Sequence, residues 1–340
     1  MLIDQYGRVH DYLRIAITDR CNFRCTYCMP EEGLPLGPHA ELLTLSEIAS
    51  LAEIFVQIGV RKIRITGGEP LVRHGVNTLF EQLARIEGSP ELALSTNGML
   101  LEEHLPMLWS HGVHQLNISL DTLRAERFHT ITGRDSSEEV QQAIHAAVKF
   151  RSNGRSFRSV KLNMVVMRGI NDDELLDFVR FGKELADLSA GGPALEVRFI
   201  EYMPFPGNAW VEAQCVPWSE MLSQIQSEYV LEAAAPAPGR SGPARSFDVR
   251  SAGFRIGFIT TVSDPSCAEC GRLRLTADGM LRTCLFGQDG LNLRKMLQSG
   301  ANSAAIASAV NAALQSKWLE HPSAQELVQL NTREMISIGG

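Results

Sequence analysis

Residues 12–29 read YLRIAITDRCNFRCTYCM, a β-rich run followed at once by Cys21, Cys25 and Cys28. Three thiols on so short a loop converge on one point. Soft thiolate sulfur favours an iron–sulfur cluster, zinc or Cu(I). The spacing argues against zinc, which is commonly held by paired CxxC motifs or by Cys with His, and the loop has no histidine. A [4Fe–4S] cluster held by three cysteines keeps one iron open, and this iron can bind a cofactor or a substrate.

The sequence around this loop repeats a strand–helix pattern from about Tyr12 to Glu201. Thr44 and Glu47 fit a capping box at the first predicted helix. Repeated strand–helix units predict a parallel sheet with right-handed crossovers. Six units are too few for a complete eight-stranded barrel. The predicted strands are 12–18, 62–66, 92–95, 115–120, 160–166 and 195–200.

The alternation within these strands places cationic side chains on one face. Residues i and i+2 share a face, so Leu13 and Ile15 can pack on outer helices while Arg14 faces inward. Barrel interiors are ordinarily apolar and buried cations are costly without partners, so the pattern predicts a bound anion. The alternative is that these side chains are salt-bridged or lie at solvated edges. The residues predicted to face inward are Arg14, Lys62, Arg64, Lys161 and Arg198.

A second cysteine group consists of Cys267, Cys270 and Cys284, with a predicted hairpin between the last two. CxxC plus a third cysteine is a common zinc arrangement, so the spacing alone is compatible with structural zinc and with a second cluster. Arg272 and Arg274 alternate beside the site, and paired arginines are typical of phosphate recognition. We therefore predict a second cluster, with a multiply charged anion such as a triphosphate between the two cysteine groups.

Composition narrows the class of protein. The chain has 32 Lys and Arg against 39 Asp and Glu, a net charge of −7, and no apolar run approaches the roughly 20 residues that span a bilayer. We expect neither nucleic acid nor a membrane as a partner. The first residues lack the apolar segment of a signal peptide, which favours the cytoplasm. Six of the seven cysteines fall into the two groups, which favours metal binding over disulfides, and Cys215 is predicted to be a lone buried residue.

The predicted fold class is α/β: an incomplete (βα)6 TIM-type barrel closed by a smaller C-terminal domain that carries a second Fe–S cluster. The stretch 233–246 is rich in Pro, Gly and Ala and is typical of a linker or exposed loop. It divides the chain into a partial barrel at 1–232 and a C-terminal domain at 247–340.

The first cysteine loop, with Tyr27 before its last cysteine, resembles the signature of the radical S-adenosylmethionine (SAM) family. The resemblance implies a [4Fe–4S] cluster whose open iron binds SAM, and cleavage of SAM to a 5′-deoxyadenosyl radical. The strand ends 66–70 (TGGEP), 95–98 (STNG) and 117–121 (NISLD) resemble the family's SAM-binding segments, in which Glu69 offers a carboxylate to an ammonium group. The implied cofactor contacts are Tyr27, Gly67, Gly68, Glu69, Pro70, Thr96, Asn97 and Ser119.

Over nearly its whole length the chain resembles the GTP 3′,8-cyclase family, through both cysteine groups, KIRITGGEPLVR (62–73) and EVRFIEYMP (196–204). The resemblance implies a lyase that converts GTP to 3′,8-cyclo-7,8-dihydro-GTP, the first step of molybdenum cofactor biosynthesis, with guanine on the second cluster. It also implies that Gly339 and Gly340 reach into the active site. The implied substrate contacts are Arg14, Lys62, Lys161, Arg198, Arg272 and Arg274.

The implied partners are GTP, a flavodoxin- or ferredoxin-like electron donor and a MoaC-type enzyme that receives the product, with a homodimer as one candidate assembly. Two rival interpretations stay open on the sequence. One is a radical SAM enzyme with a peptide or protein substrate. The other is a zinc-stabilised binding protein, which would be colourless and contain no iron.

Overall fold

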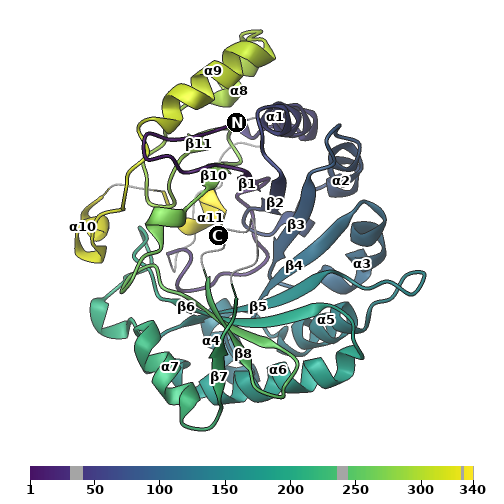
Figure 1. Cartoon of the computed structure of the whole chain (residues 1–340), viewed down its shortest axis with the longest axis vertical. Coiled ribbons are helices and arrows are strands. Elements are labelled where there is room, and N and C mark those ends of the chain that lie inside the picture. Colours follow the sequence, from purple (N-terminus) through teal and green to yellow (C-terminus); the bar gives the residue numbers. More distant parts are fainter. Residues whose placement is uncertain (31–40, 236–243, 331–332, 340) are drawn as a thin grey trace.

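The computed structural model describes residues 1–30, 41–235, 244–330 and 333–339. Strands β1–β6 form a curved sheet, and the helices between them cover its outer face (Figure 1). The predicted capping box is present: the Glu47 N–H donates to Thr44 Oγ1 at 3.1 Å, and the Thr44 N–H donates to Glu47 Oε2 at 2.7 Å. The elements are β1 (Tyr12–Ala16), α1 (Leu45–Gln57), β2 (Lys62–Thr66), α2 (Val76–Ala84), β3 (Glu91–Thr96), α3 (Leu101–Ser110), β4 (Val113–Ser119), α4 (Ala125–Thr132), α5 (Ser137–Lys149), β5 (Ser159–Val166), α6 (Leu175–Ser189) and β6 (Ala194–Glu201).

The later strands extend this sheet at both edges, in the order β11-β10-β1-β2-β3-β4-β5-β6-β9-β8-β7. Strand β10 pairs parallel with β1, and β9 pairs parallel with β6, whereas the outermost pairings are antiparallel. The prediction of an incomplete α/β barrel is confirmed, and the sheet is mixed and open. The later elements are α7 (Trp218–Gln226), β7 (Leu231–Ala233), β8 (Ala244–Val249), β9 (Arg255–Ile259), β10 (Arg272–Leu275), β11 (Leu281–Arg282), α8 (Leu293–Gln298), α9 (Ser303–Leu314), α10 (Ala324–Gln329) and α11 (Met335–Ile338).

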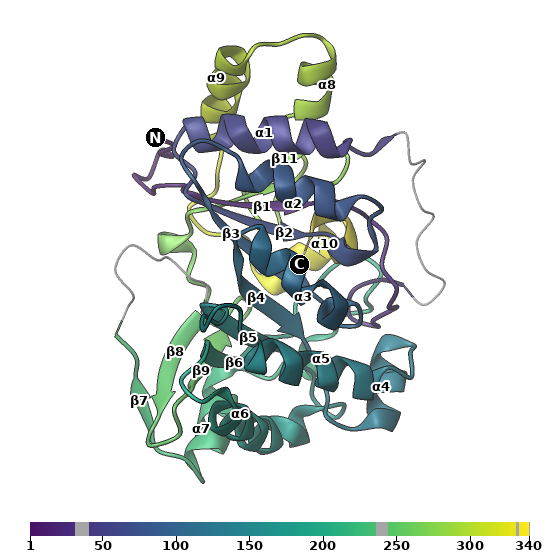
Figure 2. The ribbon, with the colours of Figure 1, turned by 90° about the vertical axis from the view of Figure 1, so that its right-hand side faces the viewer.

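The C-terminal part of the chain contributes to opposite ends of the molecule. Strands β7–β9 lie at one end, while α8 and α9 pack on α1 at the other (Figure 2). Helix α11 lies inside the curve of the sheet (Figure 1). Within the stretch predicted as a linker, residues 236–243 lie outside the described residues. The division of the chain at 232 and 247 stays a prediction.

Packing follows the alternation of the strand residues. Leu13 and Ile15 of β1 are fully buried and share the main apolar cluster with Phe55 of α1. Burial of each such side chain stabilises the fold by roughly 1.5–3 kcal/mol. Because the helices cover this apolar face, the intervening Arg14 is left to the inner face of the sheet. None of the described helices combines the length and apolarity needed to cross a membrane.

Candidate active site

The first cysteine loop is held against the end of β2 by close backbone packing. The Gly68 N–H donates to Thr18 O at 2.8 Å, and the Glu69 N–H donates to Arg20 O at 2.8 Å. A Cβ atom at Gly68 would lie 2.3 Å from Arg20 O, and one at Gly67 (φ +152°) would lie 2.6 Å from Thr18 O. Only glycine permits this approach. The two glycines therefore fix the cysteine loop, and both also line the cavity next to it.

The three thiols of this loop line the same cavity. Burial raises the pKa of Cys21 to about 11 and, with help from the Cys21 thiol and the Asp121 carboxyl, the pKa of Cys28 to about 12. Burial and the Asp121 carboxyl also raise the pKa of Cys25 well above its ordinary value. These raised pKa values mean that the three half-buried thiols become thiolates only beside a cationic partner. The irons of a cluster supply one, so this donor set fits a [4Fe–4S] cluster.

Glu69 is turned away from the cavity. Its buried carboxylate accepts hydrogen bonds from the Leu71 N–H at 3.0 Å, the Thr96 hydroxyl at 2.8 Å and the Asn97 N–H at 2.7 Å. Burial raises the pKa of Glu69 to about 7. The expectation that Glu69 offers its carboxylate to a cofactor ammonium group is therefore at odds with the geometry, and Pro70 is likewise absent from the cavity lining. Of the predicted cofactor contacts, those that line the cavity are Tyr27, Gly67, Gly68, Thr96, Asn97 and Ser119.

Tyr27 anchors the cysteine loop to neighbouring segments through hydrogen bonds. Its hydroxyl donates to Asp121 Oδ2 at 2.8 Å, and Asp121 Oδ1 accepts from the Val165 N–H at 2.8 Å. The Asn208 side chain donates to Tyr27 O at 3.1 Å. Burial raises the pKa of Asp121 to about 6. The contact of Asn208 with the cysteine loop was not predicted from the sequence, because it depends on β6 lying beside this loop in the fold.

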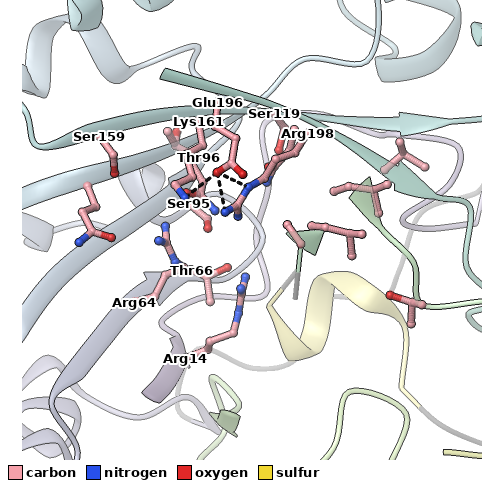
Figure 3. Close-up of a pocket in the computed structure, with 18 of the residues that line it drawn as sticks. Arg14, Arg64, Thr66, Ser95, Thr96, Ser119, Ser159, Lys161, Glu196 and Arg198 are labelled. Atoms are coloured by element: carbon pink, nitrogen blue, oxygen red, sulfur yellow. Dashed lines mark hydrogen bonds and ion pairs between the residues drawn. The ribbon is translucent and has the colours of Figure 1, made fainter. Parts of the chain in front are cut away.

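A cavity of about 1080 Å³ lies inside the curved sheet. Figure 3 shows Arg14 and Arg64 entering it from one side and Lys161 and Arg198 from another. The strand alternation thus directs cations inward, as predicted. All seven side chains predicted to bind an anion line this one cavity: Arg14, Lys62, Arg64, Lys161, Arg198, Arg272 and Arg274.

Three arginines occupy paired register positions on three neighbouring strands of the sheet. Arg14 of β1 is in register with Arg274 of β10 on one side and with Arg64 of β2 on the other. Arg64 donates to the Tyr12 hydroxyl at 2.6 Å and to Leu94 O at 2.7 Å. Although burial opposes it, Arg64, Arg14 and Lys62 lower the pKa of Tyr12 to about 7. Burial lowers the pKa of Arg14 to about 10, and burial and Arg14 lower that of Arg274 well below its ordinary value. Adjacent like charges destabilise a sheet, so this arginine row (Arg274, Arg14 and Arg64) favours the binding of an anion.

Two other cations of the cavity share a carboxylate. Glu196 Oε2 lies 2.7 Å from Lys161 Nζ and 2.7 Å from Arg198 Nη2, as the dashed lines in Figure 3 show. Although burial opposes it, Arg198 and Lys161 lower the pKa of Glu196 to about 2. Burial lowers the pKa of Lys161 to about 8. The salt-bridged alternative raised from the sequence therefore applies to Lys161 and Arg198.

The second cysteine group surrounds a smaller cavity of about 60 Å³. Cys267, Cys270 and Cys284 line it, and Arg272 and Arg274 line both this cavity and the larger one. Although burial opposes it, the charges of Arg272 and then Lys317 lower the pKa of Cys270 to about 6. Among the described residues, no three Cys, His, Asp or Glu side chains form a site for a single metal ion. The three converging thiols are the donor set that a second cluster requires.

Sequence reasoning missed two basic residues beside this second group. Lys317 Nζ donates to Cys270 O at 3.0 Å and lies 3.6 Å from Cys270 Sγ. Arg8 Nη1 donates to Cys267 O at 2.9 Å. Each is an isolated basic residue without a local motif. Only the tertiary fold brings the first and last parts of the chain to these cysteines.

The C-terminal end approaches the arginine row. The Arg274 guanidinium donates to Gly339 O. Gly339 has φ +73°, and a Cβ atom there would lie 2.6 Å from Thr66 Cγ2 and 3.2 Å from Ala16 Cβ. A glycine is therefore required where this segment passes the ends of β1 and β2. Gly340 lies outside the described residues.

Comparison with known protein families divides the chain into two matches. Residues 15–182 match the Radical SAM superfamily, and residues 195–322 match the family described as Molybdenum Cofactor Synthesis C. The first match contains the cysteine loop with Cys21, Cys25 and Cys28, and the second contains Cys267, Cys270 and Cys284. Membership of the radical SAM family implies SAM and one [4Fe–4S] cluster.

Individual relatives match most of the chain. A protein named GTP 3′,8-cyclase from Moorella thermoacetica is 42% identical over 337 residues, covering 99% of both chains. Molybdenum cofactor biosynthesis protein 1 from Mus musculus is 44% identical over 338 residues, 99% of this chain and 51% of that protein. The chain thus spans about half the length of this mammalian relative.

Solved structures show the same fold at low sequence identity. Streptococcus suis SuiB bound to S-adenosylmethionine has a TM-score of 0.58 and 13% identity, covering 97% of this chain and 77% of that one. The GTP 3′,8-cyclase from Moorella thermoacetica supports the stronger conclusion, because it is similar to this chain from end to end. The chain belongs to the GTP 3′,8-cyclase family of radical SAM proteins.

Proposed function

We propose that this chain is a GTP 3′,8-cyclase, which converts GTP to 3′,8-cyclo-7,8-dihydro-GTP at the start of molybdenum cofactor biosynthesis. One observation carries the proposal: the row formed by Arg274, Arg14 and Arg64 lines a cavity that also contains the first cysteine group and adjoins the second. Three neighbouring guanidinium groups, two of them on buried residues, match the charge and the several acceptor oxygens of a triphosphate. The name of the Moorella thermoacetica relative supports the same activity.

The first cysteine group would hold the cluster that the family implies, through Cys21, Cys25 and Cys28. The side chains and glycines at the neighbouring strand ends would bind SAM. When bound, cluster and SAM supply the radical chemistry that removes a hydrogen atom from ribose C3′ of GTP and joins C3′ to guanine C8. The chain itself positions the cysteine loop. Gly67 and Gly68 hold the loop by close backbone packing, and Tyr27 fixes it through the hydrogen bond to Asp121.

The second cysteine group would hold a second [4Fe–4S] cluster through Cys267, Cys270 and Cys284, and guanine would bind at this end of the cavity. Arg272 and Arg274 line both cavities, so they can contact a nucleotide that bridges the two cysteine groups. Glu196 offsets one of the two positive charges of Lys161 and Arg198. It thereby holds both cations in the cavity without a full desolvation penalty.

The remaining partners follow from the reaction and the family resemblance. One-electron reduction requires a donor, for which a flavodoxin- or ferredoxin-like protein is proposed, and the product would pass to a MoaC-type enzyme. Gly339 and Gly340 would lie at the active site, next to Arg274. A homodimer and a cytoplasmic location stay predictions.

The test is an anaerobic assay with GTP, SAM and a reductant, after reconstitution with iron and sulfide. We expect 5′-deoxyadenosine together with a cyclised nucleotide, both detected by mass spectrometry. Formation of neither product by a protein with full iron content would overturn the proposal. Colour and elemental analysis exclude the zinc interpretation if the preparation is brown and carries iron and sulfide.

ATP serves as the matched substrate control, because it has the same ribose and triphosphate but a different base. A cyclised product from GTP and none from ATP would show that the base is recognised as well as the phosphates. Equal turnover of both would show that the phosphates alone select the substrate.

A further inference from the structure

Lys317 is a buried lysine whose ammonium group points at the second cysteine group. Lys317 as a whole is 3% exposed. Nζ lies 3.0 Å from Cys270 O, 3.1 Å from Arg272 O, 3.6 Å from Cys270 Sγ and 2.9 Å from His10 Nε2. These contacts are two carbonyls, a sulfur and an imidazole, with no carboxylate among them. A buried ammonium is costly without an anionic partner, and the Cys270 sulfur is the one of these four atoms that can carry a negative charge.

A scaffold from the N-terminal segment holds this lysine in place. His10 is fully buried, and its Nδ1 lies 2.9 Å from Arg8 O. A carbonyl only accepts, so Nδ1 carries the proton and Nε2 accepts from Lys317. Arg8 in turn donates to Asp4 Oδ2 and to Cys267 O. The ammonium group is therefore oriented by residues that themselves contact the cysteine segment.

The two carbonyls that Lys317 binds belong to Cys270 and Arg272. These residues flank the turn at which the cysteine segment enters β10. Lys317 thus fixes the backbone of a predicted cluster ligand and of a predicted phosphate contact together. The three N–H donors of Lys317 match the two carbonyls and His10 Nε2, so the Cys270 sulfur at 3.6 Å is influenced mainly by the charge of the ammonium group.

We propose that Lys317 is a positioning residue for the second cluster: its ammonium group, held 3.6 Å from the Cys270 sulfur, raises the reduction potential of the cluster bound there. The inference rests on the proposed second cluster. Reduction adds a negative charge, and a cation beside a ligand sulfur stabilises the reduced state. Hydrogen bonds to ligand sulfurs and net charge are known determinants of cluster potentials.

The test uses the full chain with Cys21, Cys25 and Cys28 all changed to Ala, so that iron can bind only at the second group. Lys317→Met is introduced into this parent, and the reduction potential is measured by an anaerobic titration followed by electron paramagnetic resonance. We expect the reduced-to-oxidised ratio at a fixed potential to fall about tenfold, a shift of 59 mV to more negative potential for a one-electron couple. The control is Lys295→Met, which removes an exposed lysine from α8 and should leave the potential unchanged.

The outcomes separate the two proposals. Full iron content with an unchanged potential in Lys317→Met would overturn the role of Lys317 and leave the second cluster standing. A parent that binds no iron would overturn the second cluster and this inference with it. If Lys317→Met does not fold, as judged by circular dichroism, Lys317→Gln is measured in its place with the same criteria. Gln keeps a hydrogen-bond donor but loses the charge, and the negative shift is again expected.

Discussion

The two cysteine groups have similar donor sets but opposite electrostatic surroundings. The first lies beside the buried carboxyl of Asp121, and the pKa of all three thiols is raised. The second lies beside Arg272 and Lys317, which lower the pKa of Cys270, while burial keeps the pKa of Cys267 and Cys284 raised. A site near carboxylates suits a cationic cofactor such as SAM, whereas a site near guanidinium groups suits an anionic substrate. The difference supports the proposal that the two cysteine groups lie beside different ligands.

The largest expected effect comes from removing one cysteine of each group. Cys21→Ala should abolish SAM cleavage, because the proposed SAM-binding cluster is lost. Cys270→Ala should keep some uncoupled SAM cleavage and lose cyclisation. The measurement is 5′-deoxyadenosine and cyclised nucleotide from the same reaction, with Cys215→Ala, outside both groups, as control. Equal loss of SAM cleavage in the first two variants would remove the functional difference between the groups.

A smaller effect is expected from Arg272→Ala, which removes one guanidinium group between the two cavities. GTP binding should weaken by about 1.5–3 kcal/mol, the usual range for a hydrogen bond to a charged group. Calorimetric titration with GTP measures this. Arg250→Ala, at an exposed salt bridge with Glu232, should leave GTP affinity unchanged. An unaltered affinity in Arg272→Ala would take that residue out of the binding site.

The scaffold of the second group predicts an acid-sensitive contribution to stability. Burial, and then the charge of Lys317, lowers the pKa of His10 from 6.5 to about 4. The unfolded chain therefore binds a proton more readily than the folded one. The stabilisation is complete above pH 6.5 and falls as the pH drops towards 4, a loss of about 2 kcal/mol between pH 7 and pH 5. Urea unfolding of metal-free protein at both pH values measures it. His10→Gln should show a smaller loss than the unaltered chain, and an identical loss would exclude His10 as the source.

The smallest expected effect is a difference in salt dependence between the two ligands. GTP is bound by a cluster of cations, so its affinity should fall several-fold as ionic strength rises. SAM is a cation of much smaller net charge than GTP, so its affinity should change less. Titrations of both ligands over a series of salt concentrations test this. A steeper salt dependence for SAM would reverse the electrostatic assignment of the two ends.

Short-range features of the site were predictable because they depend on neighbouring residues. The cysteine spacings, the capping box at Thr44 and the inward direction of Arg14 all follow from local geometry. The sequence did not reveal the partners of the Glu69 carboxylate, which accepts from the Thr96 hydroxyl and two backbone N–H groups, and its contact with a cofactor stays a prediction. Prediction was incomplete for Glu196, which shares a strand face with Arg198 but whose role as a counter-ion depends on Lys161 from the neighbouring strand.

By itself, the sequence determined two triplets of thiols and a set of strands with one apolar and one cationic face, because residue spacing and a period of two are local properties. Only the tertiary structure decided that β10 returns to pair with β1, which sets Arg274 in register with Arg14 and Arg64 and brings the cavity of the second cysteine group next to that of the first. It also decided that His10 and Lys317, from opposite ends of the chain, meet at Cys270. Such contacts depend on strand order and register, which no local pattern specifies.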